Sequence, residues 1–134
     1  MEEKISHKMA EEEFSRFATV ARLDMEKPRD FSDRTDVSSS RDLFIYHVKR
    51  GDIEVNEEGW PTVLTQSEDL PRIEFTKRPK VTALRAMDKY KQGDQSAKTL
   101  AMMGDTLGIA PVKLNSLDYA DFEIVSLVFS LFLV

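Results

Sequence analysis

Residues 124–134 constrain the fold more than any other part of the chain, because they carry nine large apolar side chains, two serines and no charge. Burying one large apolar side chain stabilises a protein by about 1.5–3 kcal/mol, so covering this segment contributes roughly 15–25 kcal/mol before opposing terms. The net stability of an ordinary domain is smaller, about 5–15 kcal/mol. We therefore expect the segment to be covered by the chain's own core, by a second copy, or by another protein.

The composition narrows the class of protein. A chain of 134 residues suits a single domain, and a chain without cysteine has neither disulfides nor thiolate metal sites. Residues 1–21 are charged throughout, unlike a secretory signal, and residues 124–134 are about half the roughly 20 needed to span a bilayer. We expect a cytoplasmic protein that has no membrane partner.

Charge is unevenly distributed along the chain. The net charge of −5 argues against a general nucleic-acid binder, yet residues 70–92 carry seven basic and two acidic side chains. This basic segment can attract the chain's own acidic segments or an acidic partner, while the nearby Phe75 gives only thin support for base stacking. The residues that we assign to a basic patch are Arg72, Lys77, Arg78, Lys80 and Arg85.

The first third of the chain has the apolar spacing of helices. Apolar residues recur every three or four positions over residues 11–23 and again over 36–50, which predicts two helices after a frayed leader at residues 1–10. Serines at 38–40 are expected to cap the second helix, and Gly51 to end it. The residues expected on the apolar side of that helix are Leu43, Phe44, His47 and Val48.

The period of the pattern then changes from helical to alternating. Residues 52–55 alternate polar and apolar, a turn cluster occupies 56–59, and residues 60–65 are again apolar and β-branched. This predicts a β-hairpin in which Pro61 lies at an edge or at the start of a strand. Alternation over residues 72–76 indicates a third strand.

Helical spacing returns after the strands, and the residues that supply the apolar steps are Val81, Leu84, Met87, Met102, Met103 and Leu107. We predict helices over residues 80–91 and 95–107, the second ended by Gly108, and a short helical turn over 111–115. The last helix is expected to begin at Asp118.

The start of this last helix has specific signals. Asp118 is the expected N-cap, with Asp121 adding negative charge to the first turn. Leu117 and Phe122 have the spacing of a hydrophobic staple. Beyond them the helix is apolar on nearly all sides, which is typical of a buried helix.

Together these patterns predict an α+β fold. It is mostly helical, with a small antiparallel hairpin or three-stranded sheet at about residues 52–76 and a buried apolar C-terminal helix. We expect one domain over residues 1–134, in which a helical front at 11–51 is followed by a β-hairpin region at 52–78 and a helical region at 79–134.

The sequence contains no motif that indicates catalysis. Its two histidines, His7 and His47, have no partner residues at metal-ligand spacing, and its acidic clusters lie where they would stabilise helix N-termini. No phosphate-binding glycine loop or nucleophile elbow is present. We expect no enzymatic activity, no cofactor and no metal.

Residues 100–133 carry a more specific pattern. A helix is followed by a glycine–apolar–x–proline break, a short turn, the motif Leu-Asp-x-x-Asp-Phe and an apolar helix that ends in Phe-Leu. This pattern resembles the small tail assembly chaperones of long-tailed bacteriophages. The residues that carry it are Leu107, Gly108, Pro111, Val112, Leu114, Leu117, Asp118, Asp121, Phe122, Phe132 and Leu133.

The resemblance implies a non-enzymatic protein of the host cytoplasm that binds the tape-measure and tail tube proteins during tail assembly. The positions that we expect to bind the partner or to frame its site are Leu117, Phe122, Leu127, Leu131, Met102 and Met103. Two alternatives stay open. One is a small adaptor or regulatory protein that forms a homodimer through its last helix. The other is a nucleic-acid-associated protein that uses the basic segment at residues 72–91.

Overall fold

The apolar segment at the end of the sequence is buried in the chain's own core. It forms most of the last helix, α6 (Tyr119–Phe132), in a computed structural model that describes residues 5–23, 31–88 and 95–133. The side chains of α6 that the core covers are Ile124, Val125, Val128, Phe129, Leu131 and Phe132. Of the three expected ways to cover the segment, the structure therefore shows the first. Leu133, which belongs to the segment but follows α6, is exposed.

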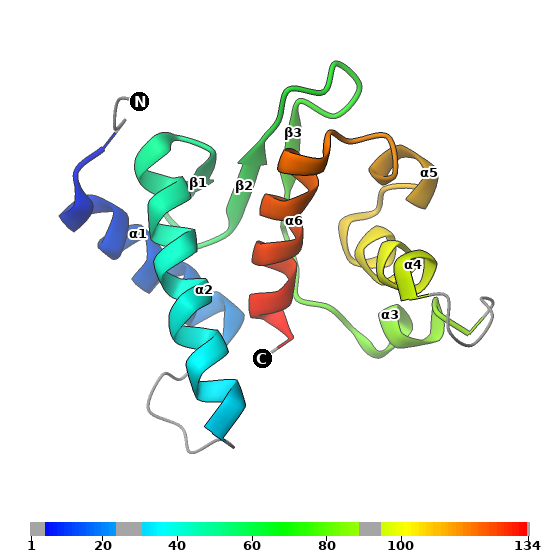
Figure 1. Ribbon diagram of the computed structural model, residues 1–134, viewed down its shortest axis with the longest axis horizontal. Helices are drawn as coiled ribbons and strands as arrows, with labels where there is room; N and C mark the ends of the chain where they lie inside the picture. Colours follow the sequence, from blue (N-terminus) through cyan, green and yellow to red (C-terminus); the bar gives the residue numbers. More distant parts are fainter. Residues whose placement is uncertain (1–4, 24–30, 89–94, 134) are drawn as a thin grey trace.

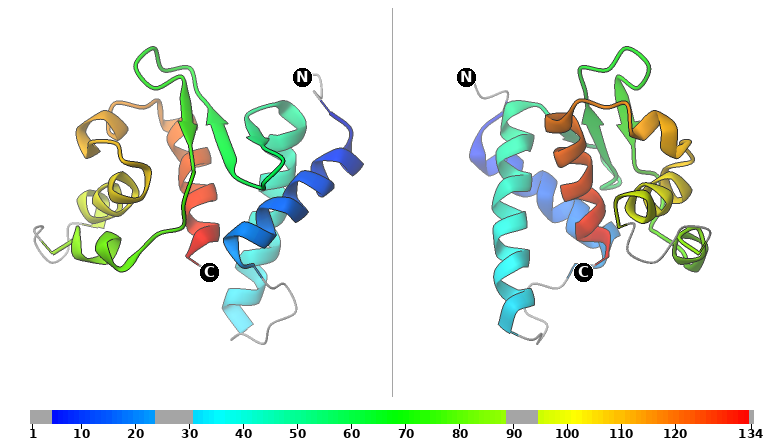
Figure 2. Two further views of the ribbon diagram at one scale, coloured as in Figure 1. Left: turned by 180° about the vertical axis from the view of Figure 1, so that it is seen from behind. Right: turned by 45° about the vertical axis from the view of Figure 1, so that its right-hand side comes forward.

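The remaining elements surround α6 (Figure 1). Helix α2 runs beside α6, the sheet lies behind α6, and α3, α4 and α5 gather on the side away from α2 (Figures 1 and 2). The fold is thus α+β and mostly helical, as predicted. The bounds are α1 His7–Ala21, α2 Phe31–Arg50, β1 Ile53–Val55, β2 Pro61–Leu64, β3 Arg72–Glu74, α3 Val81–Arg85, α4 Gln95–Leu107 and α5 Pro111–Leu114.

Aromatic rings hold the centre of the core together. The ring of Phe17 in α1 stacks on Phe44 in α2, with 4.6 Å between centroids, and meets the edge of Phe132 in α6 at 5.2 Å. Phe132 also stacks on Phe75, just after β3, at 5.6 Å and on Trp60 at 6.2 Å. Such ring pairs add about 0.5–1.5 kcal/mol each to the free energy of burial, so Phe132 links α6 to α1 and to residues that flank β2 and β3.

The three strands form one antiparallel sheet in the order β1-β2-β3. Val63 in the central strand is opposite Ile53 on one side and Ile73 on the other, which places three buried β-branched side chains in one row. Pro61 begins β2, as expected, so its missing N–H removes no interior bond of the sheet. The predicted turn at residues 56–59 is closed by the Asn56 side chain, which accepts the N–H groups of Gly59 and Trp60.

Helix α1 covers the outer edge of β1. The Arg16 guanidinium donates to the carbonyl oxygens of Val55 and Asn56 at 3.1 Å, and the Glu13 carboxylate accepts the Val55 N–H at 3.0 Å. Open strand edges invite pairing with other chains, and these side chains occupy this one. The contact needs a glycine at position 59, because a Cβ there would lie 2.4 Å from the Arg16 carbonyl oxygen.

The α3, α4 and α5 helices pack on one another. Helix α4 ends as predicted at Gly108, which has φ +70° and donates to the Gly104 carbonyl. Gly104 also lets the chain turn back, because a Cβ there would lie 2.6 Å from the Ile109 carbonyl oxygen. Pro111 then occupies the first turn of α5, as expected.

Several predicted boundaries were wrong. Residues 7–10 of the supposed leader are helical because the Ser6 side chain caps α1 by accepting the Met9 N–H, while residues 1–4 lie outside the described part. The serines at 38–40 lie inside α2, which begins at Phe31. The helix predicted over 80–91 spans only Val81–Arg85, and residues 89–91 are not described.

Two predictions about apolar faces also need correction. Leu43 is exposed, because it lies on the side of α2 away from Phe44 and Val48, which the core buries. Val81 and Leu84 on α3 are exposed too, and Ala83 is the residue of this helix that is buried. Periodic spacing identified the helices correctly but assigned these side chains to the wrong environment.

Candidate functional site

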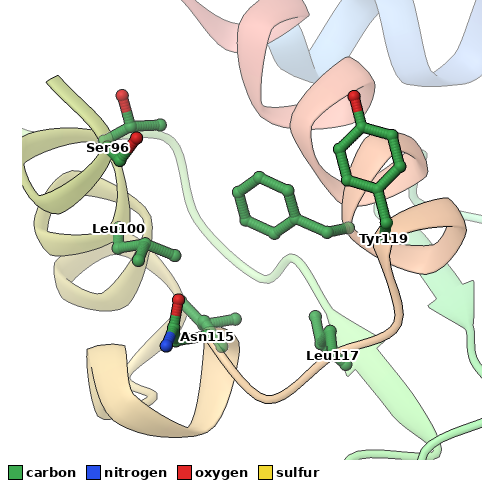
Figure 3. A pocket seen from close by; sticks show the side chains of 8 residues that line it. Ser96, Leu100, Asn115, Leu117 and Tyr119 are labelled. Atoms are coloured by element: carbon green, nitrogen blue, oxygen red, sulfur yellow. The ribbon is translucent and has the colours of Figure 1, made fainter.

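A cavity of about 420 Å³ opens between α4, α5 and the start of α6 (Figure 3). Most of its surface is apolar, and hydroxyl and amide groups lie among the apolar side chains. Leu100 and Asn115 lie on one side of it and Leu117 and Tyr119 on the other (Figure 3). The residues that line this cavity, which we call the α4–α6 cavity, are Ser96, Thr99, Leu100, Leu114, Asn115, Leu117, Tyr119 and Phe122.

The start of α6 sets one wall of this cavity. Asp118 is the N-cap, as predicted, and its carboxylate accepts the Ala120 N–H at 3.0 Å. The cap fixes where the helix begins, and Leu117 and Phe122, the expected staple pair, both line the cavity. Tyr119 is the first residue of the helix, and 74% of its surface is exposed. The cap therefore places an exposed aromatic ring at the rim of an apolar cavity.

The Tyr119 hydroxyl interacts with the next turn of its own helix. Its hydrogen bond with the Glu123 carboxylate, together with the negative charge of that group, raises the pKa of Tyr119 above the ordinary value of 10.0. At neutral pH the group is therefore a protonated phenol. It offers the cavity an apolar ring and a hydroxyl, the combination that makes tyrosine common in protein interfaces.

Asp121 adds negative charge to the first turn of α6, as predicted, and it also has a role that the sequence did not indicate. Its side chain is buried, and its carboxylate accepts the Gln66 N–H from the β2–β3 loop at 3.0 Å. A charge-assisted bond of this kind is shorter and stronger than a neutral one. Asp121 therefore ties α6 to the sheet and holds the wall of the cavity in place.

A second, wider groove of about 670 Å³ lies between α2 and α6. One end of it is polar. His47 Nδ1 lies 2.8 Å from Asp52 Oδ2, and Arg50 Nε lies 3.4 Å from the same oxygen. Arg50 also donates to the Tyr46 hydroxyl at 2.7 Å, and this bond raises the pKa of the guanidinium. The Asp52 carboxylate therefore contacts both His47 and Arg50 where α2 turns at Gly51 into β1.

The six predicted partner-binding residues divide into three groups. Leu117 and Phe122 line the α4–α6 cavity, and Leu127 lines the α2–α6 groove together with Phe122. Met102 is half-buried against the core. Leu131 and Met103 are fully buried, so these two frame the fold and offer no surface to a partner.

The predicted basic patch is brought together only in part. Arg72 is on β3, where its nearest charged partner is Glu74 at 3.8 Å. The other four residues lie on α3 and the segment before it, where Lys77, Lys80 and Arg85 are exposed and Arg78 is half-buried. Phe75, the aromatic residue considered for base stacking, is 1% exposed and belongs to the core.

Sequence reasoning missed the polar and aromatic residues that line the α4–α6 cavity. The periodic spacing of apolar residues could not identify Ser96, Thr99 and Asn115, because their side chains are polar. Tyr119 could have been found, because it follows the predicted N-cap and does not share the spacing of the buried residues of α6. The His47–Asp52 contact was also missed, since the two residues belong to different predicted elements.

The described part of the chain contains neither a candidate metal site nor a candidate membrane-spanning helix. Among residues 5–23, 31–88 and 95–133, no three His, Asp or Glu side chains are grouped so that they could hold a metal ion. No helix in the same part of the chain combines the length and apolar character needed to cross a membrane. Compared with protein-family models, curated protein sequences and solved structures, the chain gives no match.

Proposed function

We propose that the protein is a non-enzymatic tail assembly chaperone of a long-tailed bacteriophage, which binds an amphipathic helix of the tape-measure protein in its α4–α6 cavity. The observation that carries this proposal is the cavity itself, an open apolar site with an exposed tyrosine at its rim. Grooves between helices receive the apolar face of a partner helix through side chains spaced three or four residues apart.

The residues behind the family resemblance build this site. Leu114, Leu117 and Phe122 line the cavity, Asp118 caps the helix that forms one wall, and Pro111 begins α5. The part of the sequence that resembles tail assembly chaperones is therefore the part that forms the binding cavity. This coincidence supports the resemblance as a statement about function.

Charged residues adjacent in sequence to the lining residues favour a helical protein as the occupant. Lys98 and Lys113 are on the α4 and α5 side, whereas Asp118 and Glu123 are on α6. An amphipathic helix commonly carries both signs of charge beside its apolar stripe and can pair with both sets. The titratable residue of the lining, Tyr119, remains protonated at neutral pH, which suits binding better than proton transfer.

The test is co-purification with the tape-measure protein encoded beside this chain. We expect a gene for a long helical tape-measure protein directly downstream, and we expect the two products to form a complex when they are expressed together. Thr99→Glu, which puts a charge on the exposed cavity wall, should weaken binding about tenfold, equivalent to 1.4 kcal/mol.

The matched control is Val112→Glu, because Val112 is an exposed helical residue outside the lining. It should leave binding unchanged. A chain encoded in a metabolic operon, or a complex that Thr99→Glu and Val112→Glu weaken equally, would contradict the proposal.

A further inference from the structure

Helix α3 presents two large apolar side chains to solvent. Val81 is 66% exposed and Leu84 is 53% exposed. Residues three apart are neighbours on the same face of a helix, so the two side chains form one small apolar ridge. Ala83 packs inward, and the Thr82 hydroxyl donates to Asp105 on α4 at 2.9 Å, which fixes the side of α3 that turns outward.

Basic residues surround this ridge. Lys77, Lys80 and Arg85 are exposed, and none of the three forms an ion pair with another residue in the described part of the chain. Elsewhere in the described chain, arginines do form ion pairs. For example, Arg41 Nη2 lies 3.4 Å from Glu11 Oε2. Of the two uses considered for the basic segment, pairing with the chain's own acidic segments is therefore not seen for these three residues within the described part of the chain.

We propose that this α3 surface is a second binding site, separate from the α4–α6 cavity, and that it receives an acidic amphipathic helix of a partner protein. The Val81–Leu84 ridge would contact the apolar stripe of that helix, and Lys77, Lys80 and Arg85 would pair with the carboxylates beside the stripe. Complementary charge of this kind steers association and fixes orientation.

The same surface fits nucleic acid and lipid less well. Binding to single strands relies on exposed aromatic rings, and Phe75, the aromatic residue considered for base stacking, is buried in the core. A helix that lies in a membrane surface needs a long apolar face, whereas α3 has five residues and exposes two large apolar side chains. An acidic protein helix matches both the charge and the size of the ridge.

The probe is a synthetic peptide of about 20 residues, long enough to form a helix. It has leucine at every third or fourth position and glutamate beside the leucines, and its control has glutamine in place of each glutamate. Fluorescence anisotropy should show that the intact protein binds the glutamate peptide and that added salt weakens the affinity. The glutamine peptide should bind about tenfold more weakly.

Charge reversal locates the site on the protein. Lys80→Glu with Arg85→Glu should weaken binding of the glutamate peptide about tenfold or more, whereas the matched pair Lys8→Glu with Arg22→Glu, exposed on α1 and at its C-cap, should not. Leu84→Ser should weaken binding of both peptides, because it removes part of the ridge. Thr99→Glu should leave the peptide affinity unchanged, so failure of this proposal is distinguishable from failure of the proposed function.

Three results would overturn the inference. The first is equal binding of the glutamate and glutamine peptides. The second is an equal effect of the two charge-reversal pairs. The third is tighter binding, at the same salt concentration, of a short DNA duplex or of vesicles made from equal parts of phosphatidylserine and phosphatidylcholine.

Discussion

The region around α6 and the region formed by α3, α4 and α5 differ in how closely their side chains pack. Around α6, aromatic rings from three helices and the sheet interlock, and Phe17, Phe44 and Phe132 are all buried. In the second region two of the three helices are short, α3 having five residues and α5 four, and a cavity remains where α4 and α5 face α6. The first region has the packing that stabilises a fold, and the second contains both surfaces that we propose for binding. Such a division is common in proteins with a rigid scaffold.

Replacing Phe132 tests the first half of this comparison and has the largest expected effect. Phe132→Ala removes a ring that contacts Phe17, Phe75 and Trp60 and leaves a cavity in a packed core. We expect the free energy of unfolding to fall by about 3–5 kcal/mol, measured by urea denaturation.

The control for Phe132→Ala is Leu133→Ala, one residue further along. Because Leu133 is 51% exposed, its replacement should change stability by less than about 0.5 kcal/mol. Similar losses for the two variants would show that the core is not centred on the aromatic cluster.

Two glycines, one in each region, sharpen the comparison. Gly59 has φ +105°, and a Cβ there would meet the Arg16 carbonyl, so Gly59→Ala should lower the free energy of unfolding by about 2–3 kcal/mol. Gly108 has φ +70° but open space around it, so Gly108→Ala should cost only about 1 kcal/mol, the strain of the left-handed backbone. Thermal unfolding of the two variants checks the order. A larger loss at Gly108 would show that the second region is the more rigid one.

Thr82→Val gives the smallest expected effect. It removes the exposed hydrogen bond from Thr82 to Asp105 that links α3 to α4, and global stability should fall by less than about 1 kcal/mol. The local result is the more informative one. Amide hydrogen exchange should become faster in α3 while α6 keeps its protection, because the two regions open separately. Equal acceleration in both would mean that the regions unfold as one unit.

The sequence was most informative at positions where one residue type determines the local conformation of the backbone. Asp118 as N-cap, Gly51 and Gly108 as helix ends and Pro61 as the first residue of a strand were all predicted correctly. It was least informative about what lies opposite a helix face. The spacing of Leu43, Val81 and Leu84 indicates helices, but which face is covered depends on elements far away in the chain.

The candidate site was predicted only in part for the same reason. Leu117 and Phe122 could be singled out because large apolar residues next to a helix cap are expected to pack. Their partners Thr99 and Asn115 reach the cavity only because α4 and α5 fold back on each other at Gly104. That turn depends on the close approach of the Ile109 carbonyl, which no local pattern in the sequence reveals.

The contact between Phe17 and Phe132 also bears on how the protein is made. Chains leave the ribosome from the N-terminus at about 5–20 residues per second. Phe14, Phe17 and Phe44 therefore emerge several seconds before α6 exists to cover them. Contacts between residues so far apart in sequence slow folding, and during that interval a nascent chain exposes apolar rings to its neighbours. If the proposed function holds, a protein that shelters other chains itself needs protection while it is being synthesised.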